Sequence, residues 1–377
     1  MRLYSMTVGM VRTAARVARD GTSSMDELAQ LLARSPALFP HTFDVRKDSV
    51  SFIRLERADY ERASFLDARI LSAQAAVQSM PWREVAAAVD AAQLAEHCTY
   101  IFHIGHVGST LLSRLIGSHP RAFGLREPMI LRVFAQLQAE TGLRPPDWSE
   151  SRFDARLSAC LKLLSRTFDP RQCAVIKATS FVSELAADLL SRTSAPRAVT
   201  MCVSPESYLA TILGGPNSRQ EAKMLLPGRL RRLHRRIGGD VWRPESLSEG
   251  ETLGLGWACE TSALAQAKRA AHDAVLGVDF ERFLAHPALI LLAALRHLGI
   301  DATQGEAEAI LRGPHMHRYS KAPEHAYDAV LRSEVLNEAR AAHRAEIRRG
   351  LAWLDRAAAE FAPVRDAMQF ADGAAKL

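Results

Sequence analysis

A glycine-containing segment, TYIFHIGHVGSTLLSRLIGSHP (residues 99–120), has the residue types and spacing of an anion site. Residues 100–104 form an apolar run typical of a strand, and Gly108 lets the backbone turn without a Cβ. Ser109 and Thr110 then begin an apolar helical pattern. Free N–H groups and the dipole at the start of such a helix attract an anion, and the two hydroxyl groups can donate to phosphate oxygens. We therefore expect a phosphate-binding loop here.

The segment differs from the loop of magnesium-dependent NTPases. The pattern GxxxxGK[ST] is absent, and so is its lysine. A kinase would also need carboxylates that hold magnesium, and none stands at a suitable place. This makes a kinase or another nucleotide-dependent transferase the less favoured interpretation. Taken alone, GHVGST fits an ordinary strand-to-helix turn as well as it fits a phosphate site.

Short apolar runs alternate with helical patterns through the middle of the chain, as in a parallel sheet covered by helices on both faces. We therefore predict an α/β fold with a P-loop-like parallel sheet flanked by helices. The predicted organisation has three parts: an N-terminal cap of helices and strands at 1–95, the α/β domain at 96–330, and a charged helical tail at 331–377. Within the cap we expect a short helix at 25–34, a strand pair around a polar turn at 43–55, and mostly helix at 58–95. The strands of the α/β domain are expected at 100–104, 122–125, 173–177, 198–203 and 275–280.

Composition restricts the class of protein. The chain of 377 residues is 48% hydrophobic, enough to bury a large core. No apolar run reaches the roughly 20 residues of a membrane span. The five cysteines form no CxxC pair, which favours buried reduced thiols in a cytoplasmic protein. Residues 1–21 lack a secretory signal, and an Arg-rich transit peptide or a first helix are the alternatives.

The net charge of +6 is concentrated in GRLRRLHRRIGG at 228–239, which contains five arginines. At helical spacing these side chains are expected to form a solvated helix face. The stretch contains no aromatic residues that could stack on single-stranded bases, so we expect no nucleic-acid partner. An anionic nucleotide or an acidic substrate would explain the excess charge equally well.

The wider string GHVGSTLLSRLIGSHPRAFGLREPMILR resembles the sulfotransferase family. In that family the loop reads P-[RK]-S-G-T-T-L-L and is followed by a helix, a His-Pro and an acidic residue. Gly105 takes the proline place and His106 the Arg/Lys place. His119-Pro120 matches the spacing, and Glu127 falls where protein-tyrosine sulfotransferases carry their catalytic glutamate. The resemblance continues in CAVIKATSF, AVTMCVSPESYLAT and LGVDFERFLAHPALILLAALRHLGI, so that it covers roughly residues 99–325.

The resemblance implies transfer of a sulfuryl group from 3′-phosphoadenosine 5′-phosphosulfate (PAPS) to a hydroxyl or amine, without a metal. It makes Glu127 the candidate base and places Lys177 near the sulfonate or the acceptor. The corresponding structural interpretations are a first-turn helix charge for Glu127 and a snorkelling side chain for Lys177. We expect Arg126 to orient Glu127, to bind the acceptor or to lie at the surface, and His103 to pack inside its strand. The remaining candidate residues are expected to contact PAPS, the sulfuryl donor. They lie in the loop, at the 3′-phosphate helix and in a basic C-terminal loop: His106, Val107, Gly108, Ser109, Thr110, Leu111, Thr211, Arg219, Arg318 and Lys321.

The sequence departs from the family pattern at two cations. His106 replaces the basic residue of the loop, and Val203 replaces an arginine that ends the 3′-phosphate strand. Arg219 or the basic stretch could supply the missing charge. A second interpretation follows: a degenerate family member that binds a nucleotide or a partner protein without catalysis. The acceptor stays open among sugars, lipids, peptides and small alcohols.

Overall fold

The computed structural model describes residues 30–32, 35–71, 76–192, 195–321, 324, 326 and 328–376. The prediction for the first 21 residues lies outside this part of the chain, as does most of the helix expected at 25–34, of which residues 30–32 are helical.

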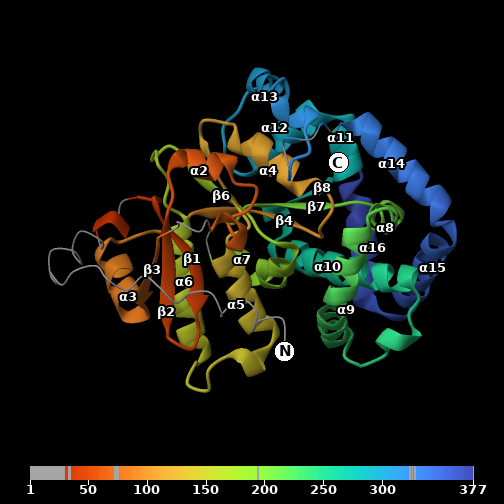
Figure 1. Ribbon diagram of the computed structural model, residues 1–377, viewed down its shortest axis with the longest axis horizontal. Coiled ribbons are helices and arrows are strands. Elements are labelled where there is room, and N and C mark those ends of the chain that lie inside the picture. Colours follow the sequence, from red (N-terminus) through yellow and green to blue (C-terminus); the bar gives the residue numbers. More distant parts are fainter. Residues whose placement is uncertain are drawn as a thin grey trace.

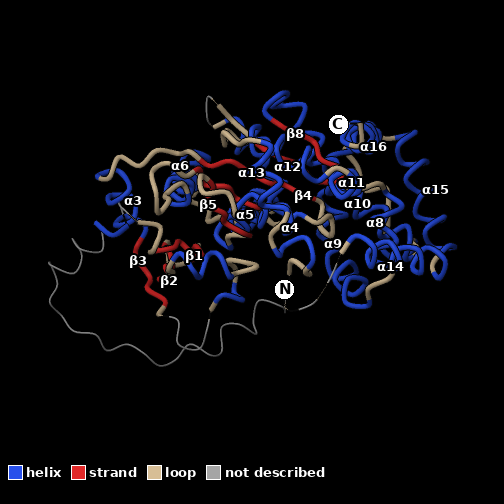
Figure 2. The backbone as a smooth tube through the Cα atoms, turned by 90° about the horizontal axis from the view of Figure 1, so that it is seen from above, coloured by secondary structure: helices blue, strands red, loops and turns tan. Residues whose placement is uncertain are grey.

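Five parallel strands form the central sheet in the order β5-β6-β4-β7-β8. Every residue of β4 and β7 is buried, as expected for strands that are covered on both faces. Figure 2 shows these strands in the middle of the molecule with helices around them. The predicted α/β fold with a parallel sheet is confirmed. The strands are β4 (Cys98–His103), β5 (Ala122–Arg126), β6 (Cys173–Lys177), β7 (Ala198–Cys202) and β8 (Val275–Asp279).

Helices cover both faces of this sheet (Figure 1). On one face, α4 (Ser109–Gly117) packs on β5 and β6, and α12 (Pro287–His297) packs on β7 and β8. On the other face, α10 (Glu249–Ala271) lies against β4 and β8, and α16 (Ala362–Ala374) lies against β8. Because α10 lies between the sheet and the outer helices, sixteen of its residues are buried.

The N-terminal part contributes a second, antiparallel sheet in the order β1-β2-β3. Its strands β1 (Leu38–Asp44) and β2 (Ser49–Arg54) form the strand pair expected around a polar turn. We expected residues 58–95 to be mostly helical, and this was wrong at β3 (Val77–Pro81), which pairs with β2. The free edge of β2 supplies the hydrogen bonds that make this short segment a strand, and α3 (Trp82–Ala91) begins directly after it.

The remaining helices connect and cover these sheets. The first group is α2 (Arg57–Arg62), α5 (Met129–Ala139), α6 (Glu150–Leu164), α7 (Ala186–Ser191), α8 (Pro205–Leu213) and α9 (Pro216–Ile237). The second group is α11 (Phe280–Ala285), α13 (Gln304–Leu311), α14 (Ala329–Ala342) and α15 (Arg344–Glu360). Six short 3-10 helices complete the described elements: η1 (Ala68–Ile70), η2 (Thr141–Leu143), η3 (Ser180–Leu185), η4 (Pro244–Ser246), η5 (His272–Ala274) and η6 (Pro314–His317).

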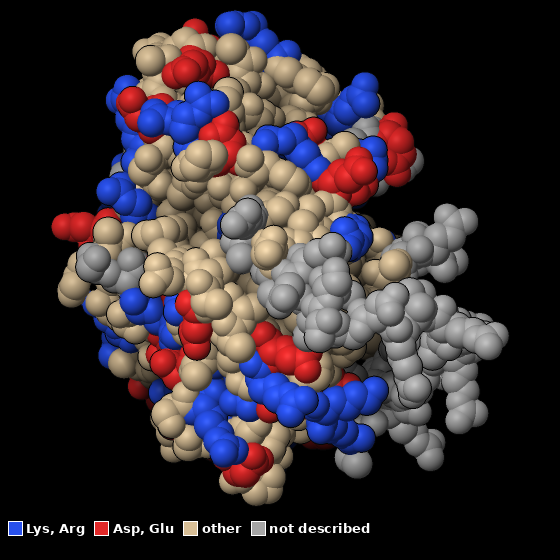
Figure 3. Space-filling view, turned by 90° about the vertical axis from the view of Figure 1, so that its left-hand side faces the viewer, with Lys and Arg blue, Asp and Glu red and all other residues tan. Residues whose placement is uncertain are grey.

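No helix within the described ranges is both long and apolar enough to cross a membrane. Four of the five cysteines are buried, Cys173 is half-buried, and all five are free thiols. On the face shown in Figure 3, basic and acidic side chains are interspersed.

Two glycines allow α10 and α15 to cross in close contact. A Cβ on Gly250 of α10 would overlap the carbonyl of Glu346, and a Cβ on Gly350 of α15 would overlap Leu209 and lie 2.5 Å from the Gly250 carbonyl oxygen. Backbone packs directly on backbone here, so the neighbouring atoms cannot move aside as a flexible side chain would.

We predict that Gly250→Ala lowers the free energy of unfolding by at least about 2 kcal/mol, because overpacking forces the two helices apart. Urea unfolding followed by circular dichroism measures this. Gly305→Ala in α13 is the matched control, since a Cβ there meets no atom within 4 Å. It is expected to be neutral or to stabilise by up to about 1 kcal/mol through helix propensity. Equal stability of the two variants would contradict the close crossing.

Candidate active site

A cavity of about 450 Å³ lies at the carboxyl ends of β4 and β6, where open α/β sheets bind their ligands. Its size is in the range of small-molecule sites. Eleven of the twelve site residues predicted from sequence line it: His106, Val107, Gly108, Ser109, Thr110, Leu111, Glu127, Lys177, Thr211, Arg318 and Lys321. The twelfth, Arg219, is outside the lining and pairs with Glu249 through contacts of 3.0 and 2.7 Å.

The loop between β4 and α4 curls through three residues with positive φ. These are Gly105 at 86°, His106 at 57° and Gly108 at 66°. Gly108 is required twice, because its φ disfavours a side chain and because a Cβ would overlap the ring of Phe280. The curl brings the chain to Ser109 at the start of α4. The first N–H groups of that helix have no carbonyl within the helix to bond, so they remain donors for a ligand.

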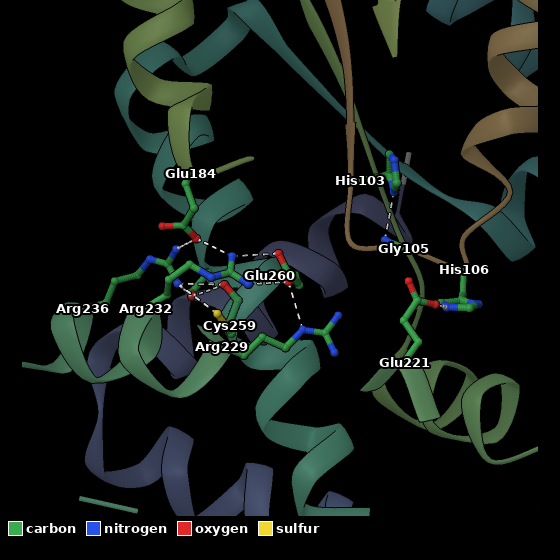
Figure 4. Close-up of polar contacts among 11 residues, drawn as sticks. His103, Gly105, His106, Glu184, Glu221, Arg229, Arg232, Arg236, Cys259 and Glu260 are labelled. Carbon is green, nitrogen blue, oxygen red and sulfur yellow. Dashed lines mark hydrogen bonds and ion pairs between the residues drawn. The ribbon is translucent and has the colours of Figure 1, made fainter. Parts of the chain in front are cut away.

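Two buried polar side chains at this loop, Thr110 and His103, differ in their hydrogen bonding. The Oγ1 of Thr110 is buried and has no hydrogen-bond partner in the described part of the chain. His103, expected to pack inside its strand, is buried there, and its Nδ1 accepts a hydrogen bond of 2.9 Å from the Gly105 N–H (Figure 4). Burial, with nearby Lys177, holds the pKa of His103 well below its usual value, so its ring is neutral. A ligand bound at this loop would supply the hydrogen-bond partner that the Thr110 hydroxyl lacks.

His106 lies beside a carboxylate that the sequence pattern did not indicate. Its Nε2 is 3.7 Å from Oε2 of Glu221 on α9 (Figure 4). The neighbouring imidazole of His106 lowers the pKa of Glu221, which outweighs the effect of burial. The position taken by a free cation in the resembled family is thus held by a histidine that already has an acidic partner.

Glu127 and Lys177 form a buried ion pair at the same edge. The parallel register of β5 and β6 sets Arg126 opposite Lys177, and the Glu127 N–H donates to the Lys177 carbonyl at 2.6 Å. Lys177 is only 1% exposed. Burial lowers the pKa of Lys177 to about 8, although the Glu127 carboxylate opposes this shift. The other carboxylate oxygen of Glu127, Oε2, lies 3.8 Å from Nη2 of Arg69. The carboxylate of this pair can therefore accept a proton, and its ammonium group can stabilise negative charge beside the loop.

Arg126 precedes this pair but turns away from it. We expected it to orient Glu127, to bind the acceptor or to be a surface residue. It is instead buried and donates to backbone carbonyls of residues 60–63, including Ala63 at 2.7 Å. Arg126 thus fixes the segment after α2, which brings Phe65 and Arg69 into the cavity wall.

The residues predicted to bind the rest of the nucleotide come from three separate segments of the chain. Thr211 lines the cavity, but its hydroxyl donates to the Ser207 carbonyl at 2.7 Å within α8. Val203 is fully buried and accepts a hydrogen bond of 3.1 Å from the Trp257 indole on its carbonyl. Arg318 and Lys321 line the cavity from the segment after η6.

The basic stretch was expected to be a solvated helix face, and for three of its five arginines this was wrong. Arg229, Arg232 and Arg236 share one side of α9 and are buried or nearly so. They face two carboxylates, Glu184 and Glu260 (Figure 4). Their spacing of three and four residues could have indicated a single buried stripe, but the acidic partners lie far away in the sequence. Arg229 also lines the cavity.

Several lining residues were missed by sequence reasoning. Phe65, Asp67 and Arg69 come from the N-terminal part, outside the motifs, and Arg132 lies on α5 at the end of the string 105–132, where no role was expected for it. No local pattern marks them, because the packing of the two sheets brings them to the site. No group of three or more His, Cys, Asp or Glu side chains in the described ranges is arranged to hold a metal ion.

Comparisons with known proteins give structural matches only. No protein-family model and no curated protein sequence matches the chain. Similar solved structures include a sulfotransferase domain from the curacin biosynthetic pathway (12% identity, TM-score 0.39), which covers 65% of this chain and 96% of that one. Sulfotransferases from Alicyclobacillus acidocaldarius (15%, TM-score 0.33; 69% and 98%) and Mycobacterium avium (11%, TM-score 0.34; 87% and 98%) are also similar.

We predict that Lys177 titrates near pH 8, which carbon-13 NMR of lysine-labelled protein measures, with Lys177→Arg assigning the signal. Glu127→Gln should lower this pKa further, because the carboxylate that favours the ammonium form is removed. Between about pH 8 and 10.5 the unfolded chain holds a proton that the folded protein has released, so this residue's contribution to stability rises with pH. Titration near 10.5 would show that Lys177 is not buried as described.

Proposed function

We propose that the protein is a sulfotransferase that moves a sulfuryl group from PAPS to a hydroxyl or amine of an acceptor. The observation that carries this proposal is one cavity in which a strand–loop–helix anion site lies beside the buried pair of Glu127 and Lys177. The sequence motifs at 105–127 agree with this arrangement of residues.

The cavity residues fit a PAPS donor. The amides of Val107–Leu111 and the hydroxyl groups of Ser109 and Thr110 would hold its 5′-phosphosulfate, and Thr110 would gain the partner that it lacks. Arg318 and Lys321, together with the helix that contains Thr211, would bind the 3′-phosphate. When bound, PAPS supplies an activated sulfuryl group on a phosphate leaving group.

Glu127 would serve as the base. Its Oε1 pairs with Lys177, so Oε2 is the oxygen available to accept the proton of the acceptor hydroxyl or amine as the new bond to sulfur forms. Lys177, whose burial makes its interactions strong, would offset the negative charge that builds on the sulfonate and bridging oxygens as the old sulfur–oxygen bond breaks. Phe65, whose ring centre lies 5.6 Å from Nζ of Lys177, lines the cavity together with Phe181, and both would help to exclude water.

One observation favours a second candidate, a protein that binds the nucleotide without catalysis. Glu221 lies against His106, so the loop presents a paired histidine where a free cation would stabilise the transferring group. Binding and turnover must therefore be measured separately.

We predict that calorimetry will detect magnesium-independent binding of adenosine 3′,5′-bisphosphate, and much weaker binding of 5′-AMP and ATP. In an assay of bisphosphate release from PAPS with a panel of phenols, alcohols and amines, Glu127→Gln should lower kcat by about 10²- to 10⁴-fold. The affinity of this variant for the bisphosphate should stay within about twofold of that of the wild type, because Glu127 is not expected to contact the nucleotide.

Glu140→Gln, which changes a carboxylate outside the cavity lining, is the control and should keep full turnover. Bisphosphate binding without turnover by the wild type would favour the non-catalytic candidate. Absence of bisphosphate binding would overturn both, and a magnesium-dependent preference for ATP would point to a kinase.

A further inference from the structure

Arg229 ends a buried charge network and reaches the wall of the cavity. Its Nε donates to Glu260 at 3.1 Å, and Arg232 donates to the same carboxylate at 2.8 Å. Arg232 and Arg236 also contact Glu184. Burial alone would raise the pKa of Glu260, but the guanidinium groups of Arg232 and Arg229 outweigh it and lower the pKa to about 2. The carboxylate is thus charged and anchors Arg229 firmly.

The network leaves unmade hydrogen bonds at the cavity. Three guanidinium groups face two carboxylates within the network, and Glu221 is close enough for Arg229 to help lower the pKa of its carboxyl. A buried charged donor whose hydrogen bonds are unmade is costly, and an anion bound at the terminal nitrogens of Arg229 would relieve that cost. The terminal nitrogens of Arg229 donate no hydrogen bond within the described ranges, and in Figure 4 they point away from Arg232 and Arg236 toward the side of Glu221.

The guanidinium of Arg229 occupies a space that a glycine of α10 leaves open. Gly256 lies inside α10, where glycine weakens a helix by about 1 kcal/mol relative to alanine. A Cβ at this position would be 3.0 Å from Nη1 of Arg229. The glycine therefore leaves the space that the guanidinium occupies, and Glu260 and α10 together fix its plane.

The position of Arg229 separates it from the loop. It follows Glu221, the partner of His106, by eight residues on α9, a distance of about 12 Å along a helix. Beside it, Leu225 and Phe181 line the same cavity, and Phe181 carries Arg232 over its ring at 4.9 Å. This wall thus offers a fixed cation among apolar groups.

The two cations that contact Glu127 already have acidic partners. Arg69 pairs with Asp67, and Lys177 pairs with Glu127. Arg229 contacts its carboxylate only through Nε, which leaves both terminal nitrogens for a ligand. A planar guanidinium held in this way matches a carboxylate.

We propose that Arg229 binds a carboxylate of the acceptor, so that the acceptor is an acid that also carries the hydroxyl or amine to be modified. This inference rests on the proposed function, because it divides the cavity into a donor part at the loop and an acceptor part at α9. Leu225 and Phe181 would contact the apolar body of such an acid.

Binding of matched acids and amides tests this proposal. The probes are 4-hydroxyphenylacetate with its amide and 6-hydroxyhexanoate with its amide, titrated by NMR into the wild-type protein with and without adenosine 3′,5′-bisphosphate. At least one acid should bind about tenfold or more tightly than its amide, as expected for a charge-assisted pair. If neither acid is preferred, the proposal is overturned, and this result needs no variant.

Variants then assign the preference to Arg229. Arg229→Gln should reduce it to within about twofold, whereas Arg231→Gln, which removes an exposed arginine of the same helix, should leave it unchanged. Bisphosphate affinity should be the same in all three proteins. If Arg229→Gln instead weakens the bisphosphate but not 5′-AMP, Arg229 serves the donor's 3′-phosphate and the proposal is wrong. If the wild-type protein does not bind the bisphosphate, this result counts against the proposed function. The preference for an acid over its amide is also measured without the bisphosphate, so that it tests Arg229 in either case.

Discussion

The parallel register of β4, β5 and β6 is the constraint on which the site depends. Lys177 ends β6 opposite Ile101 of β4 and Arg126 of β5. Because parallel strands end at one edge, the next residue of β5, Glu127, meets Lys177 although fifty residues separate them. The chain leaves β4 at the same edge of the sheet and enters the glycine loop. Three elements that each contribute one chemical group are thus brought together by backbone hydrogen bonds alone.

The parts of the fold that were predictable are those with strong local signals. Residues 173–177 and 198–202 are continuous apolar runs between helical patterns, and such runs are typical of strands buried on both faces. The turn from strand to helix was predictable because Gly108 allows the backbone to curl, whereas its role as an anion site rested on the wider resemblance. β3 was missed because a five-residue exposed strand depends on the free edge of β2, which no local pattern reveals.

The side-chain pairings of the site were beyond sequence reasoning because they are long-range. The pair of His106 and Glu221 joins the loop to α9, and the pair of Arg229 and Glu260 joins α9 to α10. Arg69 reaches the cavity only because Arg126 holds the segment after α2. The basic stretch shows the limit most clearly: composition suggested a surface, while three guanidinium groups and two buried carboxylates form part of the interior.

A crystal structure of the protein with adenosine 3′,5′-bisphosphate would test the central claim most directly. The 5′-phosphate is expected to lie against the amides of Val107–Leu111, within hydrogen-bond distance of Thr110 Oγ1. The 3′-phosphate is expected to lie on the side of Thr211. The nucleotide should leave Glu127, Lys177 and Arg229 open to a second ligand. A nucleotide bound away from the loop, or lying across Arg229 and Glu127, would contradict the assignment of donor and acceptor parts.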